Sequence, residues 1–252
     1  MVHRDTLVAH FAQTLQPQLF KDYGPNGLQV EGKEHITRLV SGVTASRALI
    51  EQAIEAKADA VVVHHGLFWR GQTGCITGWM KQRVALLLEH NINLLAYHLP
   101  LDAHAELGNN AQLGRLLGFV PDVAGWQRFG EQQLGFMGHT QHASAQGLAH
   151  HVERVLGRPV TLVPGAEGPV TRVAWCTGGA QGYFEAAIEA GAQAFLTGEI
   201  SEPQAHYARE CGVSFLACGH HATERYGVQA LAAEAAQALG VEHQFIEVDN
   251  PA

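Results

Sequence analysis

The chain has 252 residues, of which 46% are hydrophobic, and its charged residues are spread along its length. This length and composition predict a globular protein that can bury one large core or two modest ones. The formal net charge of -8 argues against a surface for duplex nucleic acid, which normally carries a basic patch. No segment approaches the ~20 apolar residues of a membrane span, and the first residues lack the apolar region of a signal peptide. We therefore expect a cytoplasmic protein that makes no contact with a membrane.

Apolar residues recur at helical and at strand spacing in alternation along the chain, which is typical of parallel or mixed α/β sheets. The first half is predicted to hold helices at residues 5–15, 47–56, 80–90 and 107–117, and strands near residue 28 and at 39–43, 60–63 and 93–97. The periodicity lapses between residues 121 and 130. The second half is predicted to hold strands at 134–138, 160–163, 172–176, 194–197, 214–218 and 243–248, and helices at 144–156, 182–190, 202–211 and 223–239.

The two halves of the chain resemble each other. Residues 53–62 can be laid over residues 187–196, and residues 93–98 resemble residues 214–218 at the next strand end. We interpret this as an internal repeat. The sequence therefore predicts an α/β fold of two similar three-layer lobes that face a shared metal-binding cleft, a common place for a ligand site. The predicted lobes are residues 1–122 and residues 123–252.

A buried strand predicted at residues 60–63 runs directly into His64 and His65. Ligands of open α/β sheets collect at the carboxyl ends of the strands, so these two imidazoles are placed to hold something. Consecutive strand residues point to opposite faces, so one strand could not aim both rings at one atom. If the chain leaves the strand at His64, the two rings can diverge toward two neighbouring ions. The alternative is that they are two polar residues at a strand end. By contrast, His150 and His151 lie within a predicted helix, and we expect both to face solvent.

Other strand ends carry similar side chains. His220 and Glu224 are four residues apart and would share one face of a helix that begins there. His98 and Asp102 have the same spacing, but Pro100 between them argues for a loop. Imidazoles and carboxylates in this proportion suit Zn, Mn, Fe or Ni, and they exceed what one tetrahedral ion needs. The alternative is that these histidines are buried and hydrogen-bonded to the main chain.

Five groups of residues together resemble the family of GTP cyclohydrolase 1 type 2 homologs, also called the Nif-three-like family. The resemblance covers nearly the whole chain, and its motifs are many, ordered and specific. The motifs are residues 26–32, 42–46, 64–66, 98–102 with 108–110, and 219–224.

This resemblance implies two α/β lobes assembled into a hexameric ring, with a dinuclear metal site facing the interior. Carried over motif by motif, two divalent transition-metal ions (Zn, Mn, Fe or Ni) would be held with Glu224 as the bridging ligand. His98 would lie close by, as a further ligand or as a group that orients one. The implied ligands are His64, His65, Asp102, His220 and Glu224.

Two functions remain open at this stage. The first is a metal-dependent hydrolase that acts on a nucleotide or a related heterocycle, with His98 or His221 moving the proton. The second is a non-catalytic protein that binds or delivers metal, or a ring-shaped scaffold. The sequence contains no Ser-His-Asp set, phosphate loop or dinucleotide fingerprint that would name a substrate.

Overall fold

The computed structural model describes residues 1–252, which form two compact units. The first unit is Met1–Leu101 with Gly227–Asp249, and the second is Asp102–Tyr226 with Asn250–Ala252. This division differs from the predicted boundary after residue 122. The chain rejoins the first unit because its last strand, β13 (Glu242–Phe245), pairs in parallel with β4 (Arg38–Thr44) and so satisfies its main-chain groups there.

The first unit contains a sheet of five strands in the order β13-β4-β5-β6-β2. Strands β13, β4, β5 and β6 are parallel, and β2 is antiparallel to β6 at the edge. A separate antiparallel pair joins β1 (Val2–His3) to β3 (His35–Ile36). The remaining strands of the sheet are β2 (Gly27–Val30), β5 (Ala60–His65) and β6 (Asn93–Ala96).

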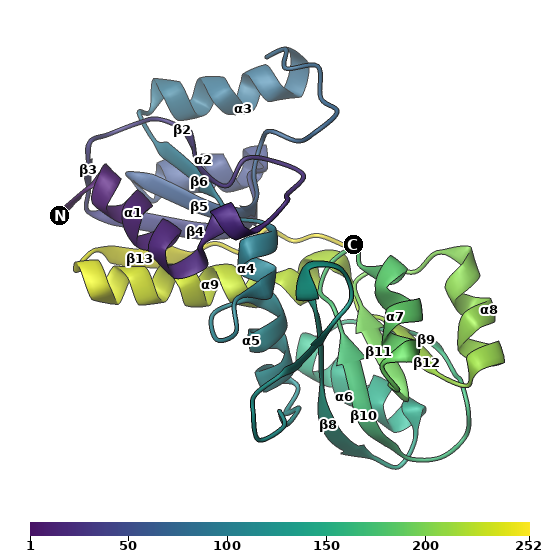
Figure 1. Ribbon diagram of the computed structural model, residues 1–252. Coiled ribbons are helices and arrows are strands. Elements are labelled where there is room, and N and C mark those ends of the chain that lie inside the picture. The colour runs from purple at the N-terminus through teal and green to yellow at the C-terminus, as the bar shows by residue number, and fades with distance from the viewer. The chain divides into compact units, whose positions relative to one another are not determined.

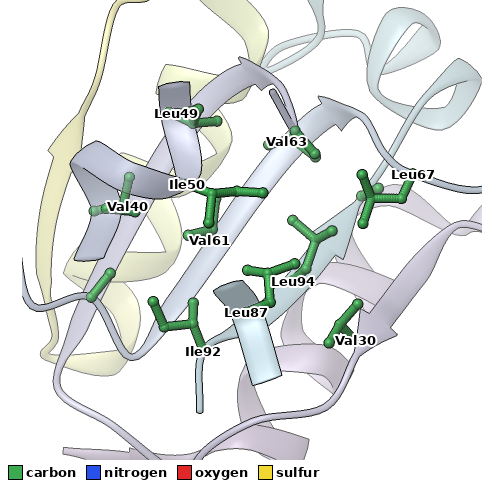
Figure 2. Close-up of a cluster of buried hydrophobic side chains, with 14 of the residues drawn as sticks. Val30, Val40, Leu49, Ile50, Val61, Val63, Leu67, Leu87, Ile92 and Leu94 are labelled. Atoms are coloured by element: carbon green, nitrogen blue, oxygen red, sulfur yellow. The ribbon is translucent and has the colours of Figure 1, made fainter. Parts of the chain in front are cut away.

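Helices cover both faces of this sheet (Figure 1). On one face, α2 (Arg47–Glu55) and α3 (Gly78–Glu89) bury Leu49, Ile50 and Leu87 against the valines and leucines of the strands (Figure 2). Burying each such side chain contributes roughly 1.5–3 kcal/mol. On the other face lie α1 (Arg4–Leu15) and the part of α9 (His220–Leu239) that belongs to this unit. The short 3-10 helix η1 (Pro17–Leu19) follows α1.

The second unit contains a sheet of six strands in the order β7-β8-β10-β11-β12-β9. Strands β10, β11 and β12 are parallel, and the other three are antiparallel to their neighbours. The strands are β7 (Gln127–Phe129), β8 (Gly135–His142), β9 (Thr161–Val163), β10 (Val170–Trp175), β11 (Ala194–Thr197) and β12 (Ser214–Ala217). The helices are α4 (Leu99–Ala103), which begins in the first unit, α5 (Asn109–Leu116), α6 (Ala145–Leu156), η2 (Glu131–Gln133), η3 (Gln181–Tyr183), α7 (Phe184–Glu189) and α8 (Glu202–Cys211).

Strand β11 shows why this sheet needs helices on both faces. Ala194 and Leu196 belong to the core that α5 and α6 cover. Phe195 points the opposite way, as alternate strand residues must, and its ring stacks on Phe184 at the start of α7, 5.7 Å between centroids. Ala194, Phe195 and Leu196 are all buried, so both faces of the strand are covered by helices. The second unit is therefore also a three-layer α/β structure.

The predicted α/β class is confirmed, and the predicted helices and strands are found with small shifts at their ends. The two units share one pattern, as an internal repeat predicts. In the first unit the parallel strands β4, β5 and β6 alternate with α2 and α3, and the antiparallel strand β2 lies beside β6. In the second unit β10, β11 and β12 alternate with α7 and α8, and the antiparallel strand β9 lies beside β12. Strand β7 and helix α4 lie where the sequence predicted no element, and α9 begins at His220 rather than at residue 223. Among the helices, none combines the length and the apolar character that crossing a membrane would require.

Candidate metal centre

His64 and His65 are the last two residues of β5. The chain does not leave the strand at His64, because β5 still pairs with β4 at His65, opposite Thr44. The two imidazoles nevertheless lie close together, with ring centroids 4.5 Å apart. His98, which follows β6, completes a cluster within the first unit, because possible ligand atoms of His64, His65 and His98 all lie within 4.8 Å of one another. Strand-end histidines therefore do gather at one edge of this sheet.

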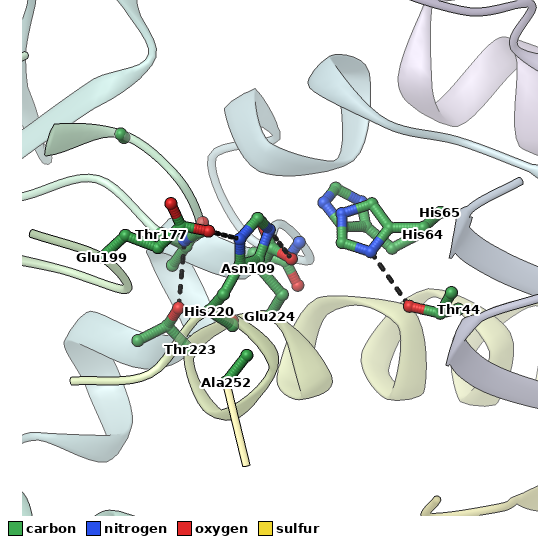
Figure 3. Close-up of polar contacts among 12 residues, drawn as sticks. Thr44, His64, His65, Asn109, Thr177, Glu199, His220, Thr223, Glu224 and Ala252 are labelled. Carbon is green, nitrogen blue, oxygen red and sulfur yellow. Dashed lines mark hydrogen bonds and ion pairs between the residues drawn. The ribbon is translucent and has the colours of Figure 1, made fainter. Parts of the chain in front are cut away.

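Each histidine of this cluster has its Nδ1 next to an oxygen atom. The Nδ1 of His64 lies 3.1 Å from the main-chain carbonyl oxygen of Tyr97. The Nδ1 of His65 lies 3.1 Å from Thr44 Oγ1 (Figure 3). The Nδ1 of His98 lies 2.7 Å from Asp22 Oδ1. A carbonyl and a carboxylate can only accept, so His64 and His98 carry a proton on Nδ1 and present Nε2 as the nitrogen with a lone pair. This is the arrangement in which metal-ligating histidines are usually found.

The alternative interpretation, that these histidines are simply buried and bonded to the main chain, fits one of the three. His64 is fully buried and donates to a main-chain carbonyl. His65 and His98 are only half-buried, and side chains hold them. A set of imidazoles oriented in this way and brought together at a strand edge could hold a cation.

In the second unit, His220 and Glu224 lie on one face of the first turns of α9, as the four-residue spacing predicted. His220 Nε2 lies 3.1 Å from Glu224 Oε2, and His220 Nδ1 lies 2.6 Å from Glu199 Oε1 (Figure 3). Burial would lower the pKa of His220, but hydrogen bonds and charge from Glu224 and then Glu199 outweigh it and raise the pKa to about 9. Two carboxylates around one imidazole make a site that favours positive charge, whether a proton or a metal ion supplies it.

Asp102 is buried in α4, which corrects the prediction of a loop at this segment. Pro100 is the second residue of that helix, a position where no intrahelical N–H bond is lost, so it does not prevent the turn. Two side chains of the second unit donate to Asp102 Oδ1: Asn109 Nδ2 at 2.9 Å and Thr177 Oγ1 at 3.3 Å. These bonds hold one oxygen of a buried carboxylate in a fixed direction.

The remaining predicted histidines have different surroundings. The main-chain N–H of His221 donates to the carbonyl oxygen of Ala252 (3.2 Å), and the side chain is buried. Its role in proton transfer stays a prediction. His150 is exposed, as expected, but His151 is half-buried and its Nε2 donates to the carbonyl oxygen of Leu117 (2.9 Å), so the expectation that both face solvent is wrong for His151.

Sequence reasoning missed the residues that orient the predicted ligands. All but Asn109 lie far from their partners in the chain. Asn26, Thr44 and Asn109 fall within the motifs that carry the family resemblance, but those motifs did not indicate what these residues do. The residues are Asp22 and Asn26 at His98, Thr44 at His65, and Asn109 and Thr177 at Asp102.

Fold and side chains together define a class: an α/β protein with two three-layer units, whose strand ends carry groups of histidines and carboxylates that could bind a metal. A family model described as Duf34/NIF3 (NGG1p interacting factor 3) matches residues 2–251. The chain belongs to this family, which confirms the resemblance inferred from its motifs.

Curated relatives agree with this assignment. The GTP cyclohydrolase 1 type 2 homolog of Neisseria meningitidis serogroup A is 53% identical over 253 residues, which cover 100% of both chains. The protein of the same name from Pseudomonas aeruginosa is 51% identical over 98% of both chains.

Solved structures show the same fold. The protein ybgI, described as of unknown function, has 44% identity and a TM-score of 0.93, with 100% of both chains covered. A protein from Thermus thermophilus has 32% identity and a TM-score of 0.89 at the same coverage. The likeness to ybgI thus extends over the whole chain.

Proposed function

We propose that this protein holds two divalent transition-metal ions and is a metal-dependent hydrolase acting on a nucleotide or a related heterocycle. One observation carries the proposal most directly. Three histidines of the first unit have their Nδ1 atoms next to oxygens, and their possible ligand atoms lie within 4.8 Å of one another. The name shared by the curated relatives supports the cyclohydrolase part of the proposal.

The proposed ligands come from both units. The complete set and the bridging role of Glu224 rest on the family resemblance, while the contacts within each unit support the members separately. Histidine nitrogens with carboxylate oxygens suit Zn, Mn, Fe or Ni better than Ca or Mg, which prefer all-oxygen sites. In the proposal the ligands are His64, His65, Asp102, His220 and Glu224, and the chains assemble into a hexameric ring.

The bound ions would lower the pKa of water, so that hydroxide is available near neutral pH to attack an electrophilic carbon of the heterocycle. The protein's own groups would then orient the substrate and move the proton. His98 suits the proton-carrying role better than His221, because its ring lies 5.0 Å from that of His64 and a carboxylate holds its Nδ1. Glu199 would keep His220 in place through its Nδ1, which leaves Nε2, the nitrogen beside Glu224, for an ion.

The first test is elemental analysis of protein purified without chelator or affinity tag. Wild type should contain about two transition-metal ions per chain, as in two-metal hydrolases. Glu224→Ala should lose them, whereas His206→Ala should not. His206 is a suitable control because it is an exposed histidine on α8 that pairs only with its helix neighbour Glu202.

Activity is tested next, with metal-loaded wild type against GTP and a panel of related nucleotides and heterocycles. Turnover that is lost in Glu224→Ala and kept in His206→Ala would support the hydrolase. Metal that binds stoichiometrically without turnover of any compound would overturn the catalytic part of the proposal and favour a metal-delivery or scaffold role. Sedimentation velocity tests the ring separately, with a hexamer as the expected species.

A further inference from the structure

Asp22 lies in the turn before β2 and makes an unusually complete set of hydrogen bonds for a single carboxylate. Its side chain is 4% exposed. Oδ1 accepts from His98 Nδ1 at 2.7 Å and from the main-chain N–H of Tyr23 at 2.6 Å. Oδ2 accepts from Asn26 Nδ2 at 2.8 Å and from the main-chain N–H of Leu99 at 2.9 Å. The proposed function uses this carboxylate only as the group that holds His98 Nδ1.

Asn26 completes the network around His98. Its Oδ1 accepts from the main-chain N–H of His98 at 2.8 Å, while its Nδ2 donates to Asp22. The residues at positions 22 and 26 therefore hold the main chain of His98, its side chain and the next residue at the same time. The turn itself is tied down, because Arg70 Nη2 donates to the carbonyl oxygen of Asp22 at 2.7 Å. His98 is thus fixed in position by a segment more than 70 residues away in the chain.

A carboxylate oxygen that accepts from Nδ1 also decides which tautomer of His98 is present. With the proton on Nδ1, the lone pair lies on Nε2, the other nitrogen of the ring. The His98 ring lies 5.0 Å from that of His64 and 5.7 Å from that of His65, between centroids. The contact with Asp22 therefore determines what His98 can offer to a cation held by this cluster.

We propose that Asp22 is a positioning residue that holds His98 as the Nδ1–H tautomer, with the Nε2 lone pair presented to the His64–His65 pair. The role of this tautomer in holding a metal ion rests on the proposed function. The tautomer of His98 itself can be measured in metal-free protein.

Asp22→Asn distinguishes this role from simple support of the turn. An asparagine replaces one accepting oxygen by an NH2 group. If that NH2 faces Leu99, it meets two donors, the Leu99 N–H and Asn26 Nδ2, which is costly for buried groups. If it faces His98, it meets only one such donor, the Tyr23 N–H, and it must donate to His98 Nδ1, which forces the proton to Nε2. We therefore expect the substitution to change the tautomer of His98.

The experiment uses metal-free, full-length protein labelled with ¹⁵N-histidine, at a pH high enough that the imidazole carries one proton. Long-range ¹H–¹⁵N correlation spectra distinguish protonated from unprotonated ring nitrogens, and His98→Gln identifies the His98 signals. Wild type should show a protonated Nδ1 and an unprotonated Nε2. Asp22→Asn should show the population shifting to the Nε2–H tautomer.

Asp59→Asn is the matched control. Asp59 is another carboxylate of the first unit with three donors, Lys33 Nζ and the main-chain N–H groups of Thr37 and Arg38. Its loss should destabilise the unit without moving the His98 signals. Competition with a chromophoric chelator should then show about 10–100-fold weaker binding of Zn²⁺ to Asp22→Asn than to wild type, and no such loss for Asp59→Asn.

An Nε2–H tautomer in wild type, or an unchanged tautomer in folded Asp22→Asn, would overturn the inference. Unchanged Zn²⁺ affinity in an Asp22→Asn protein that has changed its tautomer would overturn the purpose assigned to Asp22. Failure of wild type to bind any metal would refute the proposed function alone, because the spectra of metal-free protein still report the tautomer.

Discussion

Gly178 packs directly against the carboxylate of Glu224, and a β-carbon at position 178 would overlap Glu224 Oε1. The glycine has φ of +73°, a value that residues with a side chain rarely adopt. Its N–H donates to Thr223 Oγ1 at 3.0 Å, and its carbonyl oxygen accepts from Thr197 Oγ1 at 3.0 Å, so the main chain has no room to move away. The absence of a side chain at this position is therefore what allows Glu224 its place.

Gly178→Ala should displace Glu224 and strain the main chain at once. We expect a loss of about 1 kcal/mol or more in the free energy of unfolding and a loss of metal uptake. Denaturant unfolding and elemental analysis measure the two effects. Gly182→Ala is the control, since a β-carbon there meets nothing within 4 Å, and it should keep its metal. Full metal content in Gly178→Ala would contradict the proposed role of Glu224.

Thr44→Val should weaken the hold on His65 while leaving the shape of the side chain almost unchanged. It removes the hydroxyl that lies 3.1 Å from His65 Nδ1, so we expect about 0.5–1.5 kcal/mol lower stability and weaker Zn²⁺ binding. Thr171→Val removes a comparable bond, from Thr171 Oγ1 to Gln193 Oε1 at 3.0 Å, away from the candidate ligands. Calorimetric titration with Zn²⁺ should separate the two, and equal affinities would count against the orientation of His65 by Thr44.

Metal removal should lower the melting temperature. A ligand that binds only the folded chain stabilises it by about 2.7 kcal/mol when present at 100 times its Kd. Glu224→Gln should lose this response to added Mn²⁺ or Zn²⁺, whereas Glu234→Gln, which affects only the contact of α9 with His10 at 2.7 Å, should keep it. A metal-dependent rise that persists in Glu224→Gln would show that the ions bind elsewhere.

Asp59 should make the stability of the protein depend on pH in the acid range. Burial would raise its pKa, but hydrogen bonds from Lys33, Thr37 and Arg38 outweigh it and hold the pKa below the usual value of 3.8. Because the folded-state pKa is depressed, the stabilisation is present above the unfolded pKa and is lost as the pH falls through the folded one.

The difference in unfolding free energy between wild type and Asp59→Asn should therefore be constant from neutral pH down to about pH 5. It should shrink below about pH 4, where the unfolded chain takes up the proton first. Urea unfolding at a series of pH values measures it. A difference that grows as the pH falls would show that the sign of the pKa shift is wrong.

Local elements were largely predictable because their signals are short-range. The strand predicted at residues 60–63 and the helices predicted at 47–56 and 144–156 rest on local patterns, and β5, α2 and α6 lie there or within a few residues. Element ends and the unit boundary were less predictable. Helix α4 forms because Pro100 is its second residue, where no intrahelical bond is lost. The last strand crosses back to the first sheet because it pairs with β4, which is about 200 residues away in the chain.

The sequence by itself determined which donor types this protein offers, and that they follow strands, because residue identity and hydrophobic periodicity are properties of short segments. Only the tertiary structure decided which nitrogen His64 and His98 present, and which oxygen lies beside His65 Nδ1. The oxygens that hold the Nδ1 atoms lie 76 residues from His98, 33 from His64 and 21 from His65. No local pattern specifies such partners, since the folding of the whole unit brings them within hydrogen-bond distance, and the direction of each lone pair follows from that contact.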